Sequence, residues 1–448
     1  MPCASELDEP RRLLSQIFAA AVAAVDPAEA VRRHCRLSGE TWLVGGQPVP
    51  LRGRVVLVGA GKASAPMAQA VEEQLSQRIS GGVVVVKYGH GVPLVRARLL
   101  EAAHPVPDAA GEAGALEVEG AITGLGADDL VVACLSGGAS ALLPAPCAGL
   151  TLADKQAVTR LLRGCGAGIE ELNAVRKHLS RLKGGQLVRR AAPAQVVTLI
   201  LSDVIGDPLS AIASGPTVPD PSTLAEVRAI IARYDLATRL PASVTAFLAR
   251  DSGETPKPGD PCFARSINCL IGSNALALQA AAAAAHAHGI EPVVLSEPIT
   301  GEARQAARAL VKRSVTLAAG GKRPRLLIAG GETTVCLGDQ PGQGGRAQEF
   351  ALAAGLALSG LPGITVLAAG SDGSDGPTDA AGGFADAGTV LRAAKCGRDA
   401  RDHLARHDAY PLLAATGDLL ITGPTRTNVM DLYLALVPSP GEANPSSP

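Results

Sequence analysis

The sequence lacks an excess of charge of either sign and lacks an apolar N-terminal run long enough for a membrane. Its 41 Lys and Arg residues are balanced by 42 Asp and Glu residues, which argues against nucleic-acid binding because such proteins usually carry a basic excess. The first apolar run, Ile17 to Val25, is too short to span a bilayer. Glu6, Asp8 and Glu9 precede this run, which argues against a mitochondrial transit peptide because such peptides contain few acidic residues. We therefore expect a cytoplasmic protein with no nucleic-acid and no membrane partner.

Paired cysteines and metal-binding histidines are also lacking. The nine cysteines form no CxxC pair, and their number is odd. The eight histidines show no spacing typical of metal ligands. These features predict reduced, mostly buried thiols in an intracellular protein.

Aromatic residues make up only 2 % of the chain, whereas small and aliphatic residues are abundant, including 51 glycines. Such a composition suits helices packed on a parallel sheet, although a GC-rich genome explains the alanine excess equally well. Apolar runs followed by Gly-rich turns and helical stretches recur in the first half, with a helix expected at Ser64–Leu75. We predict an α/β fold whose N-terminal domain is doubly wound around a parallel sheet. Its expected strands are Val55–Val58, Val83–Lys87, Leu130–Leu135 and Val196–Leu201.

A polar segment rich in Pro and Gly, residues 251–261, indicates a linker. We therefore expect domains at residues 1–255 and 262–437, followed by a disordered tail at 438–448. The second domain is predicted to be α/β with a mixed sheet, because two of its strands read as a hairpin. The expected elements are strands Asn268–Ile271, Pro292–Leu295, Leu326–Ala329 and Thr333–Leu337 (the hairpin), Ile364–Ala368 and Met430–Leu436, and an Ala-rich helix ending near His288.

Two Gly-rich turns follow expected parallel strands, where α/β proteins bind ligands. The turn from Gly59 through Gly61 to Lys62 offers backbone N–H groups and a cation to a phosphate. It is neither a Walker A loop nor a complete dinucleotide fingerprint, so a tight structural turn is the alternative. The turn at 136–140 is typical of an anion nest, and its alternative is a helix start with a Ser cap. Its candidate ligand-binding residues are Ser136, Gly137, Gly138 and Ser140.

Two further segments carry candidate groups in the first half of the chain. Arg176, Lys177 and Ser180 can share one helical face. With Lys183, this face can meet a phosphate or carboxylate, unless it is only solvated. Asp203 and Asp207 follow a buried strand, a position suited to Mg²⁺ binding or catalysis, although an Asx-turn or a helix cap would also use Asp207.

The second half contributes a cation and two acids. Arg346 follows Gly344 and Gly345 at an expected helix start, where a guanidinium can bind two oxygens of a phosphate or carboxylate, or form a surface ion pair. Asp372 and Asp375 lie in a Gly- and Ser-rich loop after an expected strand, which indicates a cation site or an acid/base site.

Long strings of the sequence resemble the class II glycerate 2-kinase family from about residue 55 to 436. These strings are SGGASALLPAP, NAVRKHLSRLKGGQL, LSDVIGDPLSAIASGPTVPD, GGETTV, GGRAQEFAL, GSDGSDGPTDAAG and TGPTRTNVMDL. The resemblance implies a Rossmann-like N-terminal domain, a C-terminal domain of the MOFRL type and a site in the cleft between them. It also implies transfer of the ATP γ-phosphate to the 2-hydroxyl of D-glycerate with Mg²⁺, and an essential pair at Lys62 and Arg346.

Two positions depart from the family's usual strings, namely Ala347, where Asn is usual, and Arg426, where Gly is usual. The resemblance leads us to expect catalytic roles for Lys62 and Arg346, and we add Asp203 because of its place directly after a buried strand. The residues expected to bind Mg²⁺ are Asp207, Asp372 and Asp375, although the sequence does not rank these acids against Asp203. The expected partners are ATP and glycerate, in a monomer or homodimer. The alternatives are a nicotinamide-dependent hydroxypyruvate reductase and a non-catalytic sensor of sugar acids.

Overall fold

The computed structural model describes residues 8–250, 253–319, 323–338, 341–361 and 363–439. The chain divides into two compact units, which are treated separately. The parallel-sheet unit comprises residues 27–272. The mixed-sheet unit comprises residues 1–26 and 273–448.

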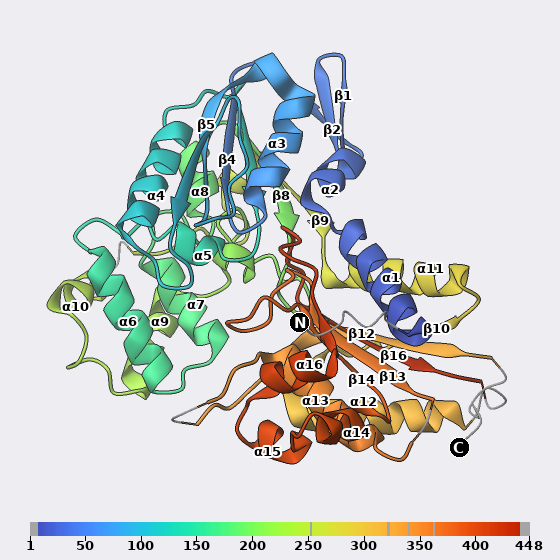
Figure 1. The fold of residues 1–448 in the computed structure, drawn as a ribbon. Helices are drawn as coiled ribbons and strands as arrows, with labels where there is room; N and C mark the ends of the chain where they lie inside the picture. Colours follow the sequence, from blue (N-terminus) through green and yellow to red (C-terminus); the bar gives the residue numbers. More distant parts are fainter. Residues whose placement is uncertain (1–7, 251–252, 320–322, 339–340, 362, 440–448) are drawn as a thin grey trace. The chain divides into compact units, whose positions relative to one another are not determined.

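The parallel-sheet unit is built on a six-stranded sheet with the order β6-β5-β4-β7-β8-β9 (Figure 1). All of its neighbouring strands pair in parallel, and this order is that of the Rossmann fold. The strand order reverses between β4 and β7, so the carboxyl ends of these two strands form the switch point of the sheet. The strands are β4 (Val55–Ala60), β5 (Ile79–Lys87), β6 (Arg98–Ala102), β7 (Leu130–Leu135), β8 (Gln195–Leu201) and β9 (Ser266–Gly272).

Both faces of this sheet are covered by helices, which explains why its strands read as continuous apolar runs. Alternate residues of β4 and β7 pack with α4 and α8 in one core, and α3 covers the opposite face (Figure 1). Helices α6, α7, α9 and α10 form a separate apolar cluster. The helices are α2 (Pro27–His34), α3 (Ser64–Leu75), α4 (Ala109–Ile122), α5 (Ala139–Leu142), α6 (Leu152–Gly164), α7 (Ile169–His178), α8 (Gln186–Ala191), α9 (Leu224–Arg233) and α10 (Ala242–Leu248).

Two small features of this unit were not expected from the sequence. A three-stranded antiparallel sheet follows α2, and its strands are β1 (Cys35–Ser38), β2 (Thr41–Val44) and β3 (Gln47–Pro50). Strand β6 forms the edge of the parallel sheet. Its sequence, RLLEA, has polar residues at both exposed positions, so it lacks the apolar run that marks the central strands.

The mixed-sheet unit contains a sheet of order β10-β12-β16-β13-β14-β15, with β11 also paired to β12. Strands β10 and β11 lie parallel to β12, and the remaining pairs are antiparallel, as the mixed-sheet prediction required. The strands are β10 (Glu291–Val294), β11 (Ile299–Glu302), β12 (Arg325–Thr334), β13 (Thr365–Gly370), β14 (Gly382–Ala385), β15 (Leu419–Leu420) and β16 (Asp431–Val437).

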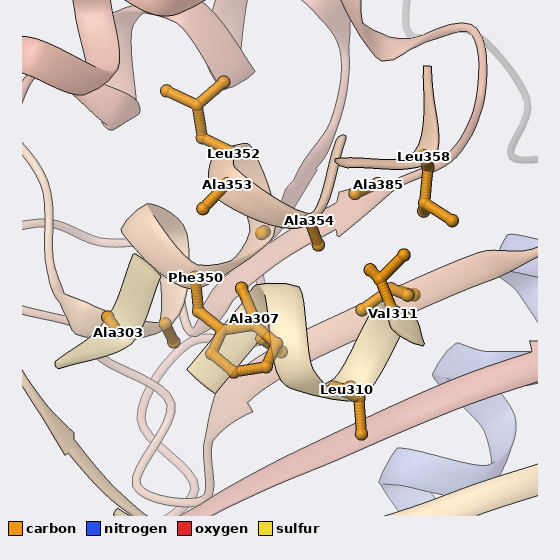
Figure 2. Packing of buried hydrophobic residues seen from close by; sticks show 14 of the residues in the cluster. Ala303, Ala307, Leu310, Val311, Phe350, Leu352, Ala353, Ala354, Leu358 and Ala385 are labelled. Carbon is orange, nitrogen blue, oxygen red and sulfur yellow. The ribbon is translucent and has the colours of Figure 1, made fainter. Parts of the chain in front are cut away.

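The core of this unit lies where α12 and α13 pack on the sheet. Figure 2 shows Phe350 of α13 beside Ala307 of α12, with Leu310 and Val311 on the same helix. Phe350 is fully buried and packs against Tyr433 of β16 with ring centroids 4.5 Å apart. The helices are α1 (Glu9–Ala24), α11 (Asn274–Ala287), α12 (Ala303–Ala318), α13 (Arg346–Leu358), α14 (Thr389–Lys395), α15 (Ala400–Ala405) and α16 (Ala409–Thr416).

The structure corrects the expected domain boundary and the expected hairpin. Strand β9 pairs with β8, so the chain leaves the parallel-sheet unit at 272 and not at 255–262. Helix α1 belongs to the mixed-sheet unit, where it packs on α11. The predicted hairpin at 326–337 is wrong because β12 continues through Gly330 and Gly331 as one strand. The expected disordered tail lies outside the described residues from 440 onward.

The eight cysteines of the described ranges are all free, but the expectation that most thiols are buried is wrong, because only Cys35 and Cys134 are buried, four are partly buried and two are exposed. No single helix in the described part of the chain has the length and apolar character of a membrane span, although α1 and α2 taken together as a bent pair do.

Candidate active site

Three of the predicted turns meet at the carboxyl edge of the parallel sheet. The turn at Gly61 and Lys62 follows β4, the turn beginning at Ser136 follows β7, and Asp203 follows β8. These three strands are neighbours in the sheet, with β4 and β7 at its switch point. Ligands of open α/β sheets bind at such a point, so the sequence-predicted groups occupy the position expected of a site.

Hydrogen bonds hold the first two turns against each other. The Lys62 N–H donates to the Gly137 carbonyl at 2.9 Å, and the Ala63 N–H donates to Ser136 Oγ at 3.0 Å. Gly61 has φ +134°, and a side chain there would overlap Ser136 Oγ. The Ser136 hydroxyl therefore fixes the backbone from which the Lys62 side chain extends.

The neighbouring turns also require glycine. A side chain at Gly137 would overlap the Asp203 carboxylate, so this carboxylate lies directly against the turn after β7. Gly138 has φ +90° and packs against the His104 ring. Gly59 differs from expectation, because it lies inside β4 and allows close approach to the Cys134 carbonyl rather than facing the turn.

His104 is a member of this cluster that the sequence did not reveal. Burial, together with the nearby charges of Lys62 and Lys87 and the His90 ring, lowers the pKa of His104 to about 4. The ring is consequently neutral at physiological pH and adds no charge beside Lys62. His104 is a single histidine after the edge strand β6, and no motif around it indicates that it lies beside the turns of the site.

Asp207 has one carboxylate oxygen that no described residue satisfies. Its φ is +54°, and its Oδ1 is buried with no hydrogen-bond partner in the structure. Asp203 lies four residues earlier in the same segment. Mg²⁺ needs only one or two carboxylates when phosphate oxygens and water complete its shell, so these residues fit the ion. In the described ranges, no three His, Cys, Asp or Glu side chains form a ready metal cluster.

The remaining predicted groups of this unit lie around α7. This helix ends at His178, so Ser180 does not share its face with Arg176 as we expected. Lys177 points instead to the buried Asp220, with Nζ 3.2 Å from Oδ1. Ser140 forms a hydroxyl–hydroxyl hydrogen bond with Ser214.

Arg346 begins α13 in the mixed-sheet unit, and Gly345 is its N-cap. Its guanidinium binds both oxygens of Asp431, with Nε–Oδ2 2.7 Å and Nη2–Oδ1 3.0 Å, and it also binds Glu332. Burial lowers the pKa of Arg346, but Asp431 and Glu332 outweigh this effect and hold the guanidinium charged. The sequence reasoning missed both acids, because each is distant from Arg346 along the chain.

Asp375 caps the helix that Arg346 begins. Its carboxylate accepts from the Ala347 N–H at 3.1 Å and from the Gln348 N–H at 2.8 Å. A side chain at Gly345 would overlap Asp375, whereas Gly344 lies near the start of α16. Burial, assisted by the nearby charge of Asp431, raises the pKa of Asp375 to about 7 against these amide contacts.

The surroundings of Asp372, and of Ala347 and Arg426, the two residues that depart from the family's usual strings, are local. The Asp372 carboxylate accepts from the Ser374 N–H at 3.0 Å, as in an Asx-turn. Ala347 is fully buried in the core of the mixed-sheet unit. Arg426 has φ +63°, a left-handed conformation that favours glycine.

Comparison with protein families matches both parts of the chain. Residues 13–249 match a domain of unknown function, DUF4147, and residues 325–431 match the MOFRL family. The first match alone covers more than half of the chain.

Individual relatives cover almost the whole chain. A protein of Agrobacterium vitis with the name "Putative hydroxypyruvate reductase" is 47 % identical over 95 % of this chain and 94 % of its own length. The D-glycerate 2-kinase of Thermotoga maritima is 41 % identical over 86 % of this chain and 91 % of its own. A crystal structure of glycerate kinase from the same organism superposes with a TM-score of 0.86 at 38 % identity, covering 96 % of this chain and all of that one.

Proposed function

The chain belongs to the glycerate kinase family that joins a DUF4147 domain to a MOFRL domain, and from this we propose that it transfers the γ-phosphate of ATP to the 2-hydroxyl of D-glycerate. The products are 2-phosphoglycerate and ADP. The observation that carries the proposal is the meeting of Lys62, the Ser136 turn and Asp203 at the switch point of the parallel sheet. The small-molecule kinase needs no nucleic-acid or membrane partner.

Phosphoryl transfer requires a protein to align two oxygens and to neutralise charge that spreads over the moving phosphoryl group. Lys62 supplies a cation from a turn whose backbone is fixed by Ser136 and Gly137. We assign Lys62 to the transferring phosphoryl group. Backbone N–H groups of the Ser136 turn bind phosphate oxygens of the nucleotide.

Arg346 is the second cation of the proposed reaction. Asp431 holds its guanidinium from one side through two hydrogen bonds, which fixes the plane of the group. A guanidinium held this way presents its remaining N–H groups to an anion at little cost in side-chain entropy. We assign it to the phosphoryl group or to the glycerate carboxylate.

Mg²⁺ fits the Asp203–Asp207 segment because Asp207 has an unpaired buried oxygen. When bound, the ion supplies charge neutralisation on the phosphate oxygens of ATP. Asp372 and Asp375 are weaker candidates, since both already accept hydrogen bonds from their own loop or from α13. Asp203 lies against the Ser136 turn, where its carboxylate can accept the proton of the 2-hydroxyl as the nucleophile attacks.

The test is ATP-dependent phosphorylation of D-glycerate, with ³¹P NMR to distinguish the 2-phosphate from the 3-phosphate. Lys62→Ala and Arg346→Ala should each lower the rate by about 10²–10⁴-fold if both cations act on the transition state. Arg160→Ala and Arg308→Ala, which remove exposed cations of α6 and α12, are the matched controls. Turnover of both active-site variants within threefold of the unmodified protein would refute the assignment.

A reductase is the second candidate, because one close relative carries that name and the strand order is that of dinucleotide-binding folds. The turn after β4 has Ser64 where the third glycine of the dinucleotide fingerprint belongs. NADH or NADPH oxidation in the presence of hydroxypyruvate tests this candidate directly. Oxidation at enzymatic rates, with no phosphorylation of glycerate, would replace the kinase proposal.

A further inference from the structure

Three cations of the parallel-sheet unit lie close enough to repel one another. They are Lys155 of α6, Arg176 of α7 and Lys183 of the loop after α7, and each pair among them interacts electrostatically. Lys155 is only 8 % exposed and Lys183 only 3 % exposed. Gathering like charges in a poorly solvated place is unfavourable unless an anion joins them.

Protein groups do not provide that anion. Lys155 Nζ donates to the Leu179 carbonyl at 2.9 Å, and Lys183 Nζ donates to the Leu143 carbonyl. Among the described residues, no carboxylate forms an ion pair with any of the three cations. The neighbouring Lys177 behaves differently, because it pairs with the buried Asp220. No carboxylate of the described residues therefore offsets the positive charge that these side chains carry when protonated.

Polar groups and strained backbone surround the same cluster. The hydroxyls of Ser140 and Ser214 lie 2.8 Å apart, and Ser214 Oγ donates to Asn173 Oδ1 at 3.5 Å, one helical turn before Arg176. The residue after Lys183 donates its N–H to the Ser214 carbonyl at 3.0 Å. Ala213, Ser214 and Gly215 all have left-handed backbones, with φ of +56°, +62° and +59°.

Two consecutive non-glycine residues in this conformation are costly, and such strain is retained where a function requires the geometry. Here the strain turns the Ser214 hydroxyl toward Ser140, which lies in the first turn of α5 directly after the glycine turn of the proposed active site. The cluster is thus continuous with that site within one unit.

We propose that Lys155, Arg176 and Lys183, with the hydroxyls of Ser140 and Ser214, form a pocket for an oxyanion, either the carboxylate of the acceptor or a phosphate group of the donor. The assignment of this anion to a substrate rests on the proposed kinase function, whereas the pocket itself does not. Lys155 is not among the residues that the sequence predicted for the site, because the sequence around it in α6 shows no motif.

Anion binding at this pocket should be coupled to proton uptake. The pKa of Lys155 is lowered to about 7, mainly by burial, with smaller contributions from the charges of Arg176 and Arg181 and an opposing one from Cys147. Burial also lowers the pKa of Lys183, to well below its usual range, and the pKa of Arg176 to about 10. A bound anion favours the charged amines, so protons are taken up on binding above pH 7. The affinity for the anion should accordingly fall as the pH rises from 7 to 9.

A purely structural role for the two lysines gives a different result. Lys155 binds a carbonyl at the end of α7, and Lys183 binds one at the end of α5, so each satisfies a helix terminus. A structural lysine affects unfolding, but it does not couple ligand binding to pH.

Isothermal titration calorimetry of D-glycerate and, separately, of inorganic phosphate tests the pocket at pH 6 and pH 8 in two buffers of different ionisation enthalpy. The unmodified protein should take up close to one additional proton at pH 8 relative to pH 6. Lys155→Met should weaken anion binding by about 10–100-fold and remove the additional proton taken up at pH 8. Arg160→Met removes an exposed cation from the same helix and should change neither quantity.

Lys155→Arg keeps the positive charge at all pH values and should retain affinity at pH 8 while losing the additional proton uptake at that pH. Absence of proton uptake in the unmodified protein overturns the proposal without any variant, so a failure of Lys155→Met to fold does not leave the question open. Equal affinities for Lys155→Met and the unmodified protein also overturn it.

The two ligands separate the two possible sources of the anion. Lys155-dependent binding of glycerate assigns the pocket to the acceptor carboxylate, and Lys155-dependent binding of phosphate alone assigns it to the donor. A protein that phosphorylates glycerate but binds both ligands independently of Lys155 retains the kinase function and loses the pocket. A protein without kinase activity that binds phosphate through Lys155 retains the pocket and loses the kinase function.

Discussion

Replacing Asp431 with Asn should lower turnover by releasing Arg346, although Asp431 is not assigned to contact a substrate. The carboxylate holds the guanidinium through two hydrogen bonds, of 2.7 Å and 3.0 Å. Asn offers one acceptor oxygen in the same volume, and its amide N–H₂ faces the guanidinium as a second donor. One of the two hydrogen bonds is lost, and the plane of Arg346 is no longer fixed.

The magnitude follows from the burial of the pair. Removing one partner of a fully buried ion pair costs about 3–5 kcal/mol. The Asp431 side chain is 3 % exposed, but that of Arg346 is 33 % exposed and retains Glu332, so we expect a loss of about 2–3 kcal/mol in stability of the mixed-sheet unit. A displacement of a positioned group by ~1 Å costs up to about 10²-fold in rate. We therefore expect kcat to fall about 10–100-fold.

The assay is ADP release coupled to NADH oxidation, with kcat and KM determined for Asp431→Asn, Arg346→Lys and the double variant. Because the two residues act as one unit, their effects on kcat should be strongly non-additive. Glu332→Gln is the control, since the Glu332 side chain is 46 % exposed and its loss leaves the Asp431 contacts intact. Circular dichroism confirms that each variant is folded.

Two results would contradict this reasoning. The first is a folded Asp431→Asn variant with kcat within threefold of the unmodified protein. The second is additive effects of Asp431→Asn and Arg346→Lys on kcat, because independent contributions would mean that Asp431 does not act through the guanidinium.

Three further perturbations test other parts of the structure. Arg426→Gly should raise thermal stability slightly, by about 0.5–1 kcal/mol in unfolding free energy, because glycine adopts the positive φ without strain; a lower melting temperature would contradict this. Gly61→Ala should abolish kinase activity, because its methyl group would overlap Ser136 Oγ and displace Lys62; retention of normal activity would argue against the required turn. The pKa of Asp375 is about 7 in the folded protein and about 4 in the unfolded chain, so between these pH values the folded protein holds a proton that the unfolded chain has lost. The free energy of unfolding should therefore fall by about 1.4 kcal/mol per pH unit as the pH rises from about 4 to 7. Asn does not titrate, so Asp375→Asn should not lose stability in this way. The melting temperature of the variant minus that of the unmodified protein should increase between pH 4 and pH 7, and a difference that does not change with pH would refute this reasoning.

Patterns within the chain determined the central strands and the turns that follow them. The strand Leu130–Leu135 and the helix Ser64–Leu75 were predicted with the bounds observed, because buried parallel strands and their connecting helices have strong local signals. The turns containing Lys62 and Ser136 were found in the same way. Sequence alone likewise indicated the α/β class and the mixed second sheet.

Partner choice between distant residues was decided only in the tertiary structure. Strand β9 lies beyond a segment rich in Pro and Gly that resembles a linker, yet its hydrogen bonds with β8 place it in the first sheet. A double glycine indicated a hairpin at 330–331, but pairing with β11 and β16 keeps β12 extended through it.

The same limit applies to the site residues. Asp431 lies in one of the strings that resemble the family and Lys155 in none, but neither position reveals its partner. Asp431 gains its importance from the distant Arg346 guanidinium, and Lys155 from two other cations. Local propensity and periodicity depend on neighbours along the chain, so they locate elements and turns. Ion pairs, orphaned carboxylate oxygens and shifted pKa values depend on neighbours in space, and these exist only once the sheets have formed.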